Sequence, residues 1–370
     1  MSGRFTVTYR IATADSADAR TRAEAIAREQ TLEAPPDATT PAIEAALLGR
    51  VDALHRDGEA HVVQISYDPD SAGPDFAQFL NVMFGNSSLQ RGLKVVGLDA
   101  GPIASLHAGP RFGIDGIRRL CGRPRGGMIA PVLKPMGLAP ADLALIAGRC
   151  AAAGADIVKE DHGLANQPSA PYRARLPRIV EAVAEANARA GGRTLYFAML
   201  AGTHEHLEDN IAFARQAGVD GLILMPGLTG FGLVARLAAE GALPVMTHPA
   251  FLGGWTAAPG SGIAHDVLFG TLMRLAGADI SVFPNWGGRF GFTQGECLAI
   301  ARACRDAAGA GRPMLPSPGG GMSVERAGDM ASAYGEDVVY LLGGSLLAMR
   351  ERIGEGIYRM REAIDAATGS

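Results

Sequence analysis

Apolar and polar residues alternate at the start of the chain, from Phe5 to Ile11 and again over residues 61–67, which predicts two strands. Residues 16–30 and 40–56 are rich in alanine and place their apolar positions at helical spacing, so both segments are predicted as helices. Together these elements indicate a small α+β unit of the ferredoxin-like kind. The Gly-Pro break in SLHAGPRFGI, at residues 105–114, predicts the passage into a second region.

Short apolar runs recur after Gly113, each followed by an alanine-rich stretch with helical periodicity. The eight runs are MIAPVLKP, ADIVKED, TLYFAML, GLILMP, LPVMTHP, ADISVFPN, PMLPSPGG and VVYLLGG. Eight strand-helix units in about 250 residues are typical of a (β/α)8 TIM barrel, whose parallel strands are buried on both faces. A doubly wound open sheet is the alternative, but its GxGxxG turn is missing. We therefore predict an α+β domain over residues 1–112 and a barrel over residues 113–370.

Composition limits the partners that this architecture can have. The chain has 370 residues, of which 48% are hydrophobic and 19% charged, and its formal net charge is −4. It shows no basic stripe, so neither a nucleic acid nor an anionic membrane surface is expected as a partner. No apolar run reaches the roughly 18 residues that a membrane span requires. A small molecule is the expected ligand.

Cysteine usage and the first residues bear on the compartment. The four cysteines, Cys121, Cys150, Cys297 and Cys304, form no CxxC pair. The start MSGRFTVTYRI has neither the basic flank nor the apolar run of a signal peptide. A reducing cytoplasm is the expected location.

Polar residues stand at the ends of several predicted barrel strands, where the active sites of such barrels lie. They follow the first, second, fifth and sixth runs and are Lys134, then Lys159, Asp161 and His162, then His248, and finally Asn285. A single lysine in such a place is usually a solvated rim residue. Polar residues at several strand ends together favour a catalytic mouth.

The second run is the most informative of these. Side chains alternate along a strand, so Lys159 and Asp161 share one face while Glu160 points to the other. A structural ion pair would explain that arrangement. A hard-cation site would explain it too, with an oxygen ligand from Asp161 and a nitrogen ligand or a proton relay from His162.

Two glycine clusters follow the seventh and eighth runs, where barrels often hold a phosphate. Glycine lets backbone N–H groups approach an anion closely, although such glycines can also serve only to turn the chain. Together they favour phosphate binding. The expected substrate-phosphate residues are Gly319, Gly320, Gly321, Gly343 and Gly344, and the loop after the sixth run adds Asn285 and Arg289.

The segment GADIVKEDHGLANQP resembles the RuBisCO large-subunit signature GxDFxKxDE and the loop that follows it. The resemblance extends in order over both predicted domains. HAGPRFGI is similar to the family's linker, APVLKPMGL to its first barrel strand, YFAMLAGTHE to its third, and GGGM and LLGG to its phosphate loops. MFGNSSLQRGLKVVGL is similar to its N-terminal segment that contains an active-site asparagine.

The resemblance implies a metal site on the second strand. Lys159 matches the lysine that carbon dioxide carbamylates to make a magnesium ligand, and Asp161 matches the adjacent carboxylate ligand. His162 stands where the family has glutamate, which puts the third ligand in doubt. Mg²⁺ is the implied cofactor.

The resemblance also implies catalytic groups from two subunits. Lys134 matches the lysine beside the enolisable carbon, and His248 matches a histidine of the fifth strand. Asn86 matches the asparagine that the N-terminal domain lends, while Glu29, in AREQTLE, weakly resembles the family's active-site glutamate. In that family the last two act on the neighbouring subunit, so a homodimer with shared active sites is expected.

Departures from the family argue against carboxylation. Carboxylases carry KPK at the first strand, and here the second lysine is Met136, which cannot transfer a proton. Their mobile loop after the sixth strand carries Gly-Lys, whereas this chain has NWGGRFGF. Arg289, the nearest cation, has a planar fork that does not replace the point charge of a lysine. The threonine-tryptophan pair expected after Glu29 is also missing.

What remains of the family's chemistry is enolisation of a phosphorylated ketose. We expect a 5-methylthioribulose-1-phosphate isomerase, with Lys134 or a carbamate on Lys159 as the base and with His248 and His162 as proton relays. The alternatives are a diketo-methylthiopentyl-phosphate enolase and an oxo-sugar-acid-phosphate decarboxylase. Two alternatives lie outside this class. One is a non-catalytic protein that binds a phosphate ligand. The other is an unrelated phosphosugar epimerase, although an epimerase of that kind would not have the MFGNSS segment.

Overall fold

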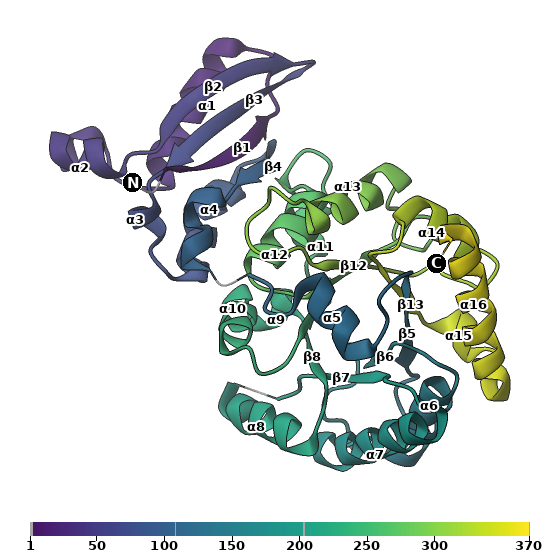
Figure 1. Cartoon of the computed structure of the whole chain (residues 1–370). Helices are drawn as coiled ribbons and strands as arrows, with labels where there is room; N and C mark the ends of the chain where they lie inside the picture. The colour runs from purple at the N-terminus through teal and green to yellow at the C-terminus, as the bar shows by residue number, and fades with distance from the viewer. Residues whose placement is uncertain (1–2, 108, 203, 370) are drawn as a thin grey trace.

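The structure is a computed structural model that describes residues 3–107, 109–202 and 204–369. A small sheet-and-helix domain stands beside a larger closed barrel surrounded by helices (Figure 1). The N-terminus lies in the small domain and the C-terminus on the rim of the barrel (Figure 1). The predicted (β/α)8 barrel with a smaller α+β domain is confirmed.

The small domain is a five-stranded sheet with the order β10-β4-β1-β3-β2. Its strands are β1 (Phe5–Ile11), β2 (Arg50–Asp57), β3 (Ala60–Tyr67), β4 (Leu93–Asp99) and β10 (Gly262–Ile263). Its helices are α1 (Ser16–Glu29), α2 (Pro41–Leu47), α3 (Pro69–Ala72) and α4 (Phe76–Phe84), with the 3-10 turns η1 (Pro36–Ala38), η2 (Asn86–Leu89) and η3 (Gly101–Leu106). Without β10 this is the ferredoxin-like arrangement, in which α1 follows β1 and α4 follows β3.

The predicted helix over residues 40–56 was only partly right. Residues Pro41–Leu47 form α2, but Arg50–Asp57 form the strand β2. A Cβ at Gly49, between them, would lie 2.8 Å from the carbonyl oxygen of Ala27, so the chain needs glycine there. β2 is an edge strand that pairs only with β3 and is largely exposed, and its register shifts between Val51 and Ala53. Its apolar residues therefore do not alternate as they do in a half-buried strand.

The barrel consists of eight parallel strands, and all eight predicted apolar runs contain one of them. The strands are β5 (Met128–Leu133), β6 (Ile157–Glu160), β7 (Leu195–Met199), β8 (Gly221–Leu224), β9 (Val245–Thr247), β11 (Ile280–Pro284), β12 (Leu315–Gly319) and β13 (Val339–Leu342). The ring closes where β13 pairs with β5. Large apolar side chains such as Phe197, Ile223 and Leu315 fill its interior, so the barrel is a packed core.

Helices surround the barrel and close one end of it. They are α6 (Pro140–Ala152), α7 (Tyr172–Ala190), α8 (Leu207–Ala217), α9 (Pro226–Thr229), α10 (Phe231–Glu240), α11 (Gly253–Thr256), α12 (Met273–Leu275), α13 (Gln294–Arg305), α14 (Ala327–Tyr334), α15 (Gly344–Leu347) and α16 (Ile353–Thr368), with the turns η4 (His204–His206), η5 (Val267–Leu272) and η6 (Arg350–Arg352). A further helix, α5 (Gly113–Cys121), precedes β5 and packs Ile117 against the interior residues at the N-terminal strand ends. The catalytic mouth must therefore lie at the other end.

A strand pairing and an aromatic stack are among the contacts that join the domains. The loop after β9 contributes β10, which pairs in parallel with β4 of the small sheet. Nearby, the ring of Phe231 stacks between Phe76 of the small domain, at 6.1 Å, and Trp255, at 5.9 Å. A segment of the barrel is thus part of the small domain's sheet.

Among the described residues, no helix has the length and apolarity that a membrane crossing requires. All four cysteines are buried and form no disulfide.

Candidate active site

The C-terminal strand ends bring the sequence-predicted residues of β5, β6 and β9 together. In the ladder, Val132 of β5 pairs with Lys159 of β6, so the strand ends are level. Lys134 then stands beside Asp161, and His248 follows β9 on the far side of the mouth. Lys134, Lys159, Asp161, His162 and His248 form a single group.

Lys159 lies deepest in the mouth. Its side chain is 1% exposed and makes no hydrogen bond or ion pair with any residue that the structure describes. Burial, with a smaller effect of the nearby charge of Lys134, lowers the pKa of Lys159 to about 8 although Asp161 opposes the shift. An amine with this pKa is partly neutral near neutral pH and can act as a base or a nucleophile.

Asp161 is held between two nitrogen groups. Its Oδ1 atom lies 3.4 Å from Lys134 Nζ and 3.3 Å from His162 Nδ1. Burial alone would raise the pKa of Asp161, but His162, Lys134 and Lys159 outweigh it and hold this pKa well below its usual range. Nδ1 of His162 is buried and has no aligned hydrogen bond, although it lies this close to the carboxylate. The carboxylate is therefore ionised and faces the mouth.

His248 is a neutral ring with a defined tautomer. Its Nδ1 atom accepts a hydrogen bond from the backbone N–H of Ala250 at 3.2 Å, which places the ring proton on Nε2. Burial lowers the pKa of His248 well below its usual value, and the charges of Lys159 and His162 add to this effect. The ring stacks on His162 with centroids 4.0 Å apart. His248 can therefore donate a hydrogen bond through Nε2–H.

Glu160 faces the other side of β6, as the alternation predicted. It forms a fully buried, bidentate ion pair with Arg175 of α7, at 2.6 and 3.0 Å, and also accepts bonds from the Tyr196 hydroxyl and the Met199 N–H. Arg175 donates in addition to the carbonyls of the loop after β6, which are those of Leu164, Ala165 and Ala170. This ion pair fixes the loop that begins with Asp161. No sequence pattern indicated that Arg175 would pair with Glu160.

The glycine loops after β12 and β13 lie at the same mouth. A Cβ at Gly343 would lie 3.4 Å from Lys134 Cε, so Lys134 passes directly over this glycine. Gly320 and Gly321 have positive φ angles of 86° and 65°, which L side chains rarely adopt. A Cβ at Gly321 would also lie 2.8 Å from the backbone nitrogen of Gly288. The loops after β11 and β12 are therefore in close contact.

Arg326 is a cation at these loops that the sequence analysis missed. Its guanidinium donates to the carbonyl of Gly321 and, at 3.3 Å, to the carbonyl of Trp286. Ser345, in the loop after β13, donates to the carbonyl of Met322 at 2.7 Å. These bonds hold the three loops together. Arg326 follows no strand, so the position of this residue in the sequence carried no signal.

Asn285 and Arg289, expected at the phosphate, have other contacts. The side chain of Asn285 is buried under α14, where it accepts a 2.7 Å bond from the Tyr334 hydroxyl and faces two methionine sulfurs. The guanidinium of Arg289 lies over the ring of Phe290, 4.9 Å from its centroid. Trp286 packs against Tyr334. The structure therefore gives Asn285 a packing role and leaves Arg289 at the exposed rim.

Glu29 and Asn86 meet in the small domain. Asn86 Nδ2 donates to Glu29 Oε1 at 3.0 Å and to Glu33 Oε1 at 2.8 Å. No contact of these three residues with the barrel of the same chain occurs among the described residues. The sequence analysis missed Glu33, whose positive φ of 48° turns it toward Asn86 just after α1. The pair thus exists, but within one subunit it lies apart from the Lys159 group.

Met136 and the two histidines of η4 are exposed. Met136, in place of the family's second lysine, is 58% exposed, and its methyl group lies next to Gly163 in the loop after β6. His204 and His206 are exposed in η4. A thioether at this point gives the mouth an apolar wall.

The donor set for a metal is incomplete without a carbamate. Among the described residues, no three His, Cys, Asp or Glu side chains stand together in a way that could hold an ion. Asp161 and His162 supply two donors, and two cationic lysines flank them. A carbamate on Lys159 would add an oxygen donor and remove a positive charge. The residues therefore fit Mg²⁺ only in that form.

Comparison with known proteins settles the family. The protein-family model described as "Ribulose bisphosphate carboxylase large chain, catalytic domain" matches residues 113–369. The chain belongs to the RuBisCO large-chain family. The ribulose bisphosphate carboxylase-like protein 1 of Rhodopseudomonas palustris is 39% identical over 361 residues, which cover 96% of each chain. A Rubisco-like protein from Rhodopseudomonas palustris has a crystal structure that superposes with a TM-score of 0.89 at 35% identity, covering 100% of this chain and 99% of that one.

Two further relatives of this RuBisCO-like chain carry the names of activities. The 5-methylthioribulose-1-phosphate isomerase of Rhodospirillum rubrum is 36% identical over 360 residues, covering 96% of this chain and 94% of the relative. The 2,3-diketo-5-methylthiopentyl-1-phosphate enolase of Exiguobacterium sibiricum is 30% identical over 327 residues, covering 86% and 81%. The expected membership is confirmed, and the chain is an enzyme of the RuBisCO-like group.

Proposed function

We propose that this RuBisCO-like chain isomerises 5-methylthioribulose-1-phosphate and does not fix carbon dioxide. The observation that carries the proposal is the joint presence of Lys134, Lys159, Asp161 and His248 at one mouth beside Met136. The first four suit enolisation of a ketose, and the methionine removes a lysine that carboxylation requires. The similarity to the isomerase of Rhodospirillum rubrum supports the same substrate.

The reaction needs a proton to leave one carbon and return to another. Lys134, or the buried amine or carbamate of Lys159, takes the proton from the hydroxyl-bearing carbon next to the ketone. The Nε2–H of His248 donates to the oxygen on which negative charge develops, since the ring is neutral and its Nδ1 is already used. His162 relays the proton to the second carbon, which gives the isomeric ketose with no net change in protons.

Mg²⁺ belongs to this proposal as the electrophile. The carbamate of Lys159, Asp161 and His162 would hold it, and when bound it polarises the ketone and the adjacent hydroxyl. The phosphate would be bound by backbone N–H groups of Gly319, Gly320, Gly321, Gly343 and Gly344, and by Arg289 at the rim.

A homodimer with shared active sites completes the proposal. Asn86 and Glu29 are hydrogen-bonded to each other, and in the part of the chain that the structure describes neither has a barrel residue as a hydrogen-bond partner. A second subunit would bring this pair to the first subunit's mouth. Leu89, at the end of η2, is 85% exposed next to Asn86 and would be buried by such a contact.

The test is incubation with Mg²⁺ and 5-methylthioribulose-1-phosphate in deuterated water, followed by NMR. We expect deuterium at the reacting carbons and a new ketose, and Lys159→Ala should abolish both. A protein that binds the phosphate ligand without exchange would be the non-catalytic alternative. Turnover of 2,3-diketo-5-methylthiopentyl-1-phosphate instead would support the enolase, and release of carbon dioxide from an oxo-acid phosphate would support the decarboxylase.

A further inference from the structure

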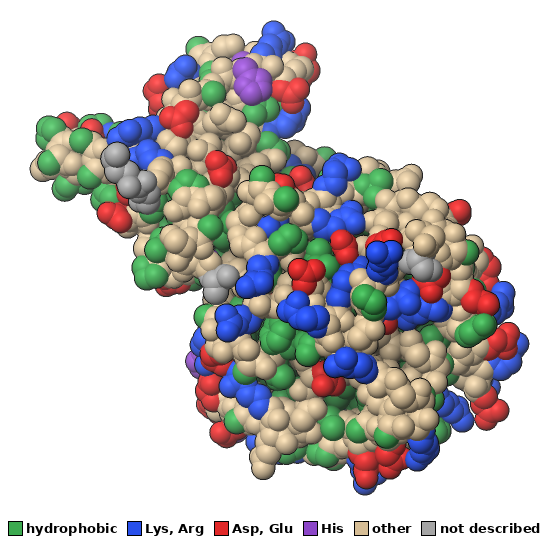
Figure 2. All heavy atoms as spheres, in the orientation of Figure 1, with side chains coloured by type: hydrophobic (Ala, Val, Ile, Leu, Met, Phe, Trp, Pro, Cys, Tyr) green, Lys and Arg blue, Asp and Glu red, His purple; other side chains and the backbone are tan. Residues whose placement is uncertain are grey.

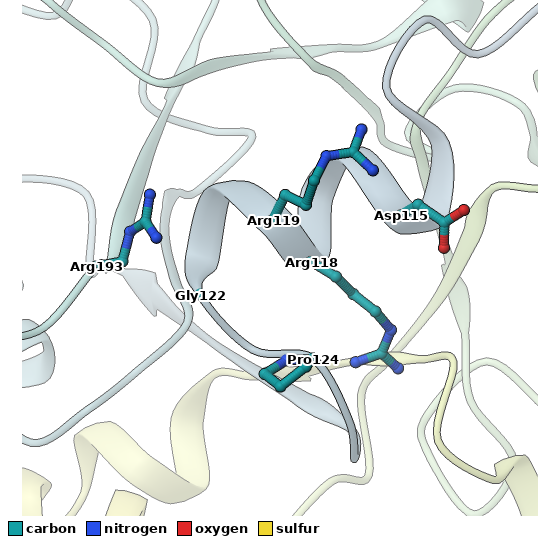
Figure 3. Close-up of a pocket in the computed structure, with 6 residues that line it drawn as sticks. All are labelled: Asp115, Arg118, Arg119, Gly122, Pro124 and Arg193. Atoms are coloured by element: carbon teal, nitrogen blue, oxygen red, sulfur yellow. The ribbon is translucent and has the colours of Figure 1, made fainter.

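A hollow lies at the end of the barrel opposite to Lys159. A cavity of about 450 Å³ adjoins α5, the helix that closes the N-terminal strand ends. Three arginines contribute to its lining, which consists of Asp115, Arg118, Arg119, Gly122, Pro124 and Arg193 (Figure 3). Its volume is in the range of small-molecule sites, which is roughly 300 to 1,000 Å³.

Arg118 has no donor left for a ligand. Its Nε and Nη2 atoms donate to Asp337 at 3.0 and 2.7 Å, and Nη2 also donates to the carbonyl of Glu336. Nη1 donates to the carbonyls of Arg123 and Gly126. A guanidinium has five N–H donors, so all those of Arg118 are used. This residue builds the wall of the hollow.

Arg119 and Arg193 are free for a ligand. Both are exposed, and neither makes a hydrogen bond or an ion pair with any residue in the described part of the chain. Arg119 leaves α5 in a different direction from Arg118, and Arg193 rises beside the turn at Gly122 (Figure 3). A Cβ at Gly122 would lie 2.8 Å from Arg193 Cδ, so the arginine packs across this glycine. Two guanidiniums of this kind suit a phosphate, which they can bind bidentately.

The surroundings add positive charge at this end of an acidic protein. Arg111 and Arg125 flank α5 in the chain, and Arg312 lies next to Gly113; all three are exposed and form no ion pair within the described ranges. Lys and Arg side chains lie around the middle of the barrel on the face in Figure 2. Asp115 lies among these arginines and offsets one of their charges, so the cluster keeps an excess of positive charge that attracts an anion.

A second hollow, lined by both apolar and polar residues, adjoins the first. It measures about 290 Å³, lies between α7 and the start of β7, and shares Arg193 with the first hollow. Leu120, Val180, Val183 and Ala184 contribute apolar surface to it. Asn187, Thr194 and Asp220 also line it and offer polar atoms. A molecule that fills both hollows needs a multiply charged anionic end at the arginines and, along α7, a part that has both apolar surface and hydrogen-bonding atoms, as a nucleobase has.

We propose that the N-terminal end of the barrel binds a nucleoside phosphate, with its phosphates at Arg119 and Arg193 and its base in the hollow lined by Val180 and Val183. This site is separate from the enolisation mouth and does not depend on the substrate proposed for it. The short segment between Arg193 and β7 connects it to the barrel wall.

Isothermal titration of the full-length protein tests the site with three probes: ATP, tripolyphosphate and adenosine. ATP should bind more tightly than the other two. Arg193→Gln and Arg119→Gln should each weaken ATP binding by about tenfold or more, since each removes charge-assisted hydrogen bonds. Ala184→Phe, at an exposed position, should fill the apolar hollow and weaken the binding of ATP but not of tripolyphosphate.

The matched control is Arg20→Gln, which removes one exposed, unpaired charge from α1 in the small domain and should leave ATP binding unchanged. Several results would overturn the proposal. One is the absence of ATP binding to the wild type at millimolar concentration. Another is equal ATP affinity in the wild type and Arg193→Gln, which would place ATP at the phosphate loops of the other mouth. Equal affinity of the wild type for tripolyphosphate and ATP would show that the nucleoside does not contribute to binding, which would contradict the proposed ligand.

Discussion

The imidazole rings of His162 and His248 stack with centroids 4.0 Å apart and planes 14° from parallel. The two residues follow β6 and β9, so their contact spans the mouth of the barrel. The stack could serve only as packing, or the nitrogens of His162 could take part in the chemistry. The close approach of Nδ1 to Asp161 favours the second role.

Replacement of His162 separates these roles. His162→Phe keeps an aromatic ring on His248 but has no nitrogen, whereas His162→Ala removes both. We expect kcat for deuterium exchange to fall by about 100-fold in both variants, because the relay and the metal ligand are lost. Activity retained in His162→Phe and lost in His162→Ala would show that packing alone matters.

Lys159 should carry a carbamate when carbon dioxide and Mg²⁺ are present, because its amine is partly neutral and has no hydrogen-bond or ion-pair partner among the described residues. We expect ¹³C-bicarbonate to give a carbamate signal by NMR that disappears in Lys159→Ala. Lys94→Ala is the control, since Lys94 lies in the small domain and donates to the carbonyls of Ala258 and Pro259. A signal that survives in Lys159→Ala would rule out this ligand.

The buried pair of Glu160 and Arg175 predicts a large effect on stability. Arg175→Met leaves the carboxylate of Glu160 buried without its cation, and the free energy of unfolding should fall by about 3 to 5 kcal/mol. The double variant Glu160→Leu/Arg175→Met should lose less, because no buried charge is left without a partner. Urea unfolding measures both. A double variant less stable than Arg175→Met would contradict this account.

Gly321→Ala should damage the phosphate site. Its Cβ would lie 2.8 Å from the nitrogen of Gly288, and its φ of 65° disfavours alanine. We expect KM for the phosphorylated substrate to rise by about tenfold or more as the loops separate. Gly232→Ala, in α10, is the matched control, since a Cβ there has no heavy atom within 4 Å. Equal KM values in the two variants would argue against a role for the Gly321 loop.

His107, near the junction of the domains, predicts a dependence of stability on pH. It is buried against the rings of Phe76 and Phe79, its Nε2 atom has no partner, and burial lowers its pKa despite the nearby Asp75. Below about pH 6.5 the unfolded chain takes up a proton that the folded ring does not, so stability is lost as the pH falls.

The measurement is Tm from pH 7 to pH 5. We expect the decrease to be smaller in His107→Phe than in the wild type, because phenylalanine keeps the ring contacts and does not titrate. His204→Gln, at an exposed histidine, should follow the wild type. A slope unchanged in His107→Phe would assign the decrease to other groups.

The eight barrel strands could be predicted because each is buried on both faces and is therefore apolar throughout. Lys159 was recognisable for the same reason, as a charge inside an apolar run. The strand β2 could not be predicted, because an edge strand with mostly exposed residues has no continuous apolar run. The two residues of β10 carry too little sequence to indicate a strand and depend on a partner 168 residues away, as in the pairing of Gly262 with Lys94.

The site residues that directly follow strands could be predicted from the sequence. The residues that hold the site loops and side chains in place could not. Arg175 lies in the first turns of α7 and Arg326 lies just before α14, and both act through backbone carbonyls that any sequence could supply. Glu33 reaches Asn86 across 53 residues. Such contacts depend on the fold as a whole, so no local pattern predicts them.

The pairing of β10 with β4 limits how this chain can be divided. The segment that begins with His248 ends as a strand of the other domain, so a change in the tilt of the small sheet moves the loop that carries this histidine. A barrel expressed without residues 1–112 would leave Gly262–Ile263 with no strand beside them and the ring of Phe231 without Phe76. The two domains can therefore be exchanged between relatives only as a matched set.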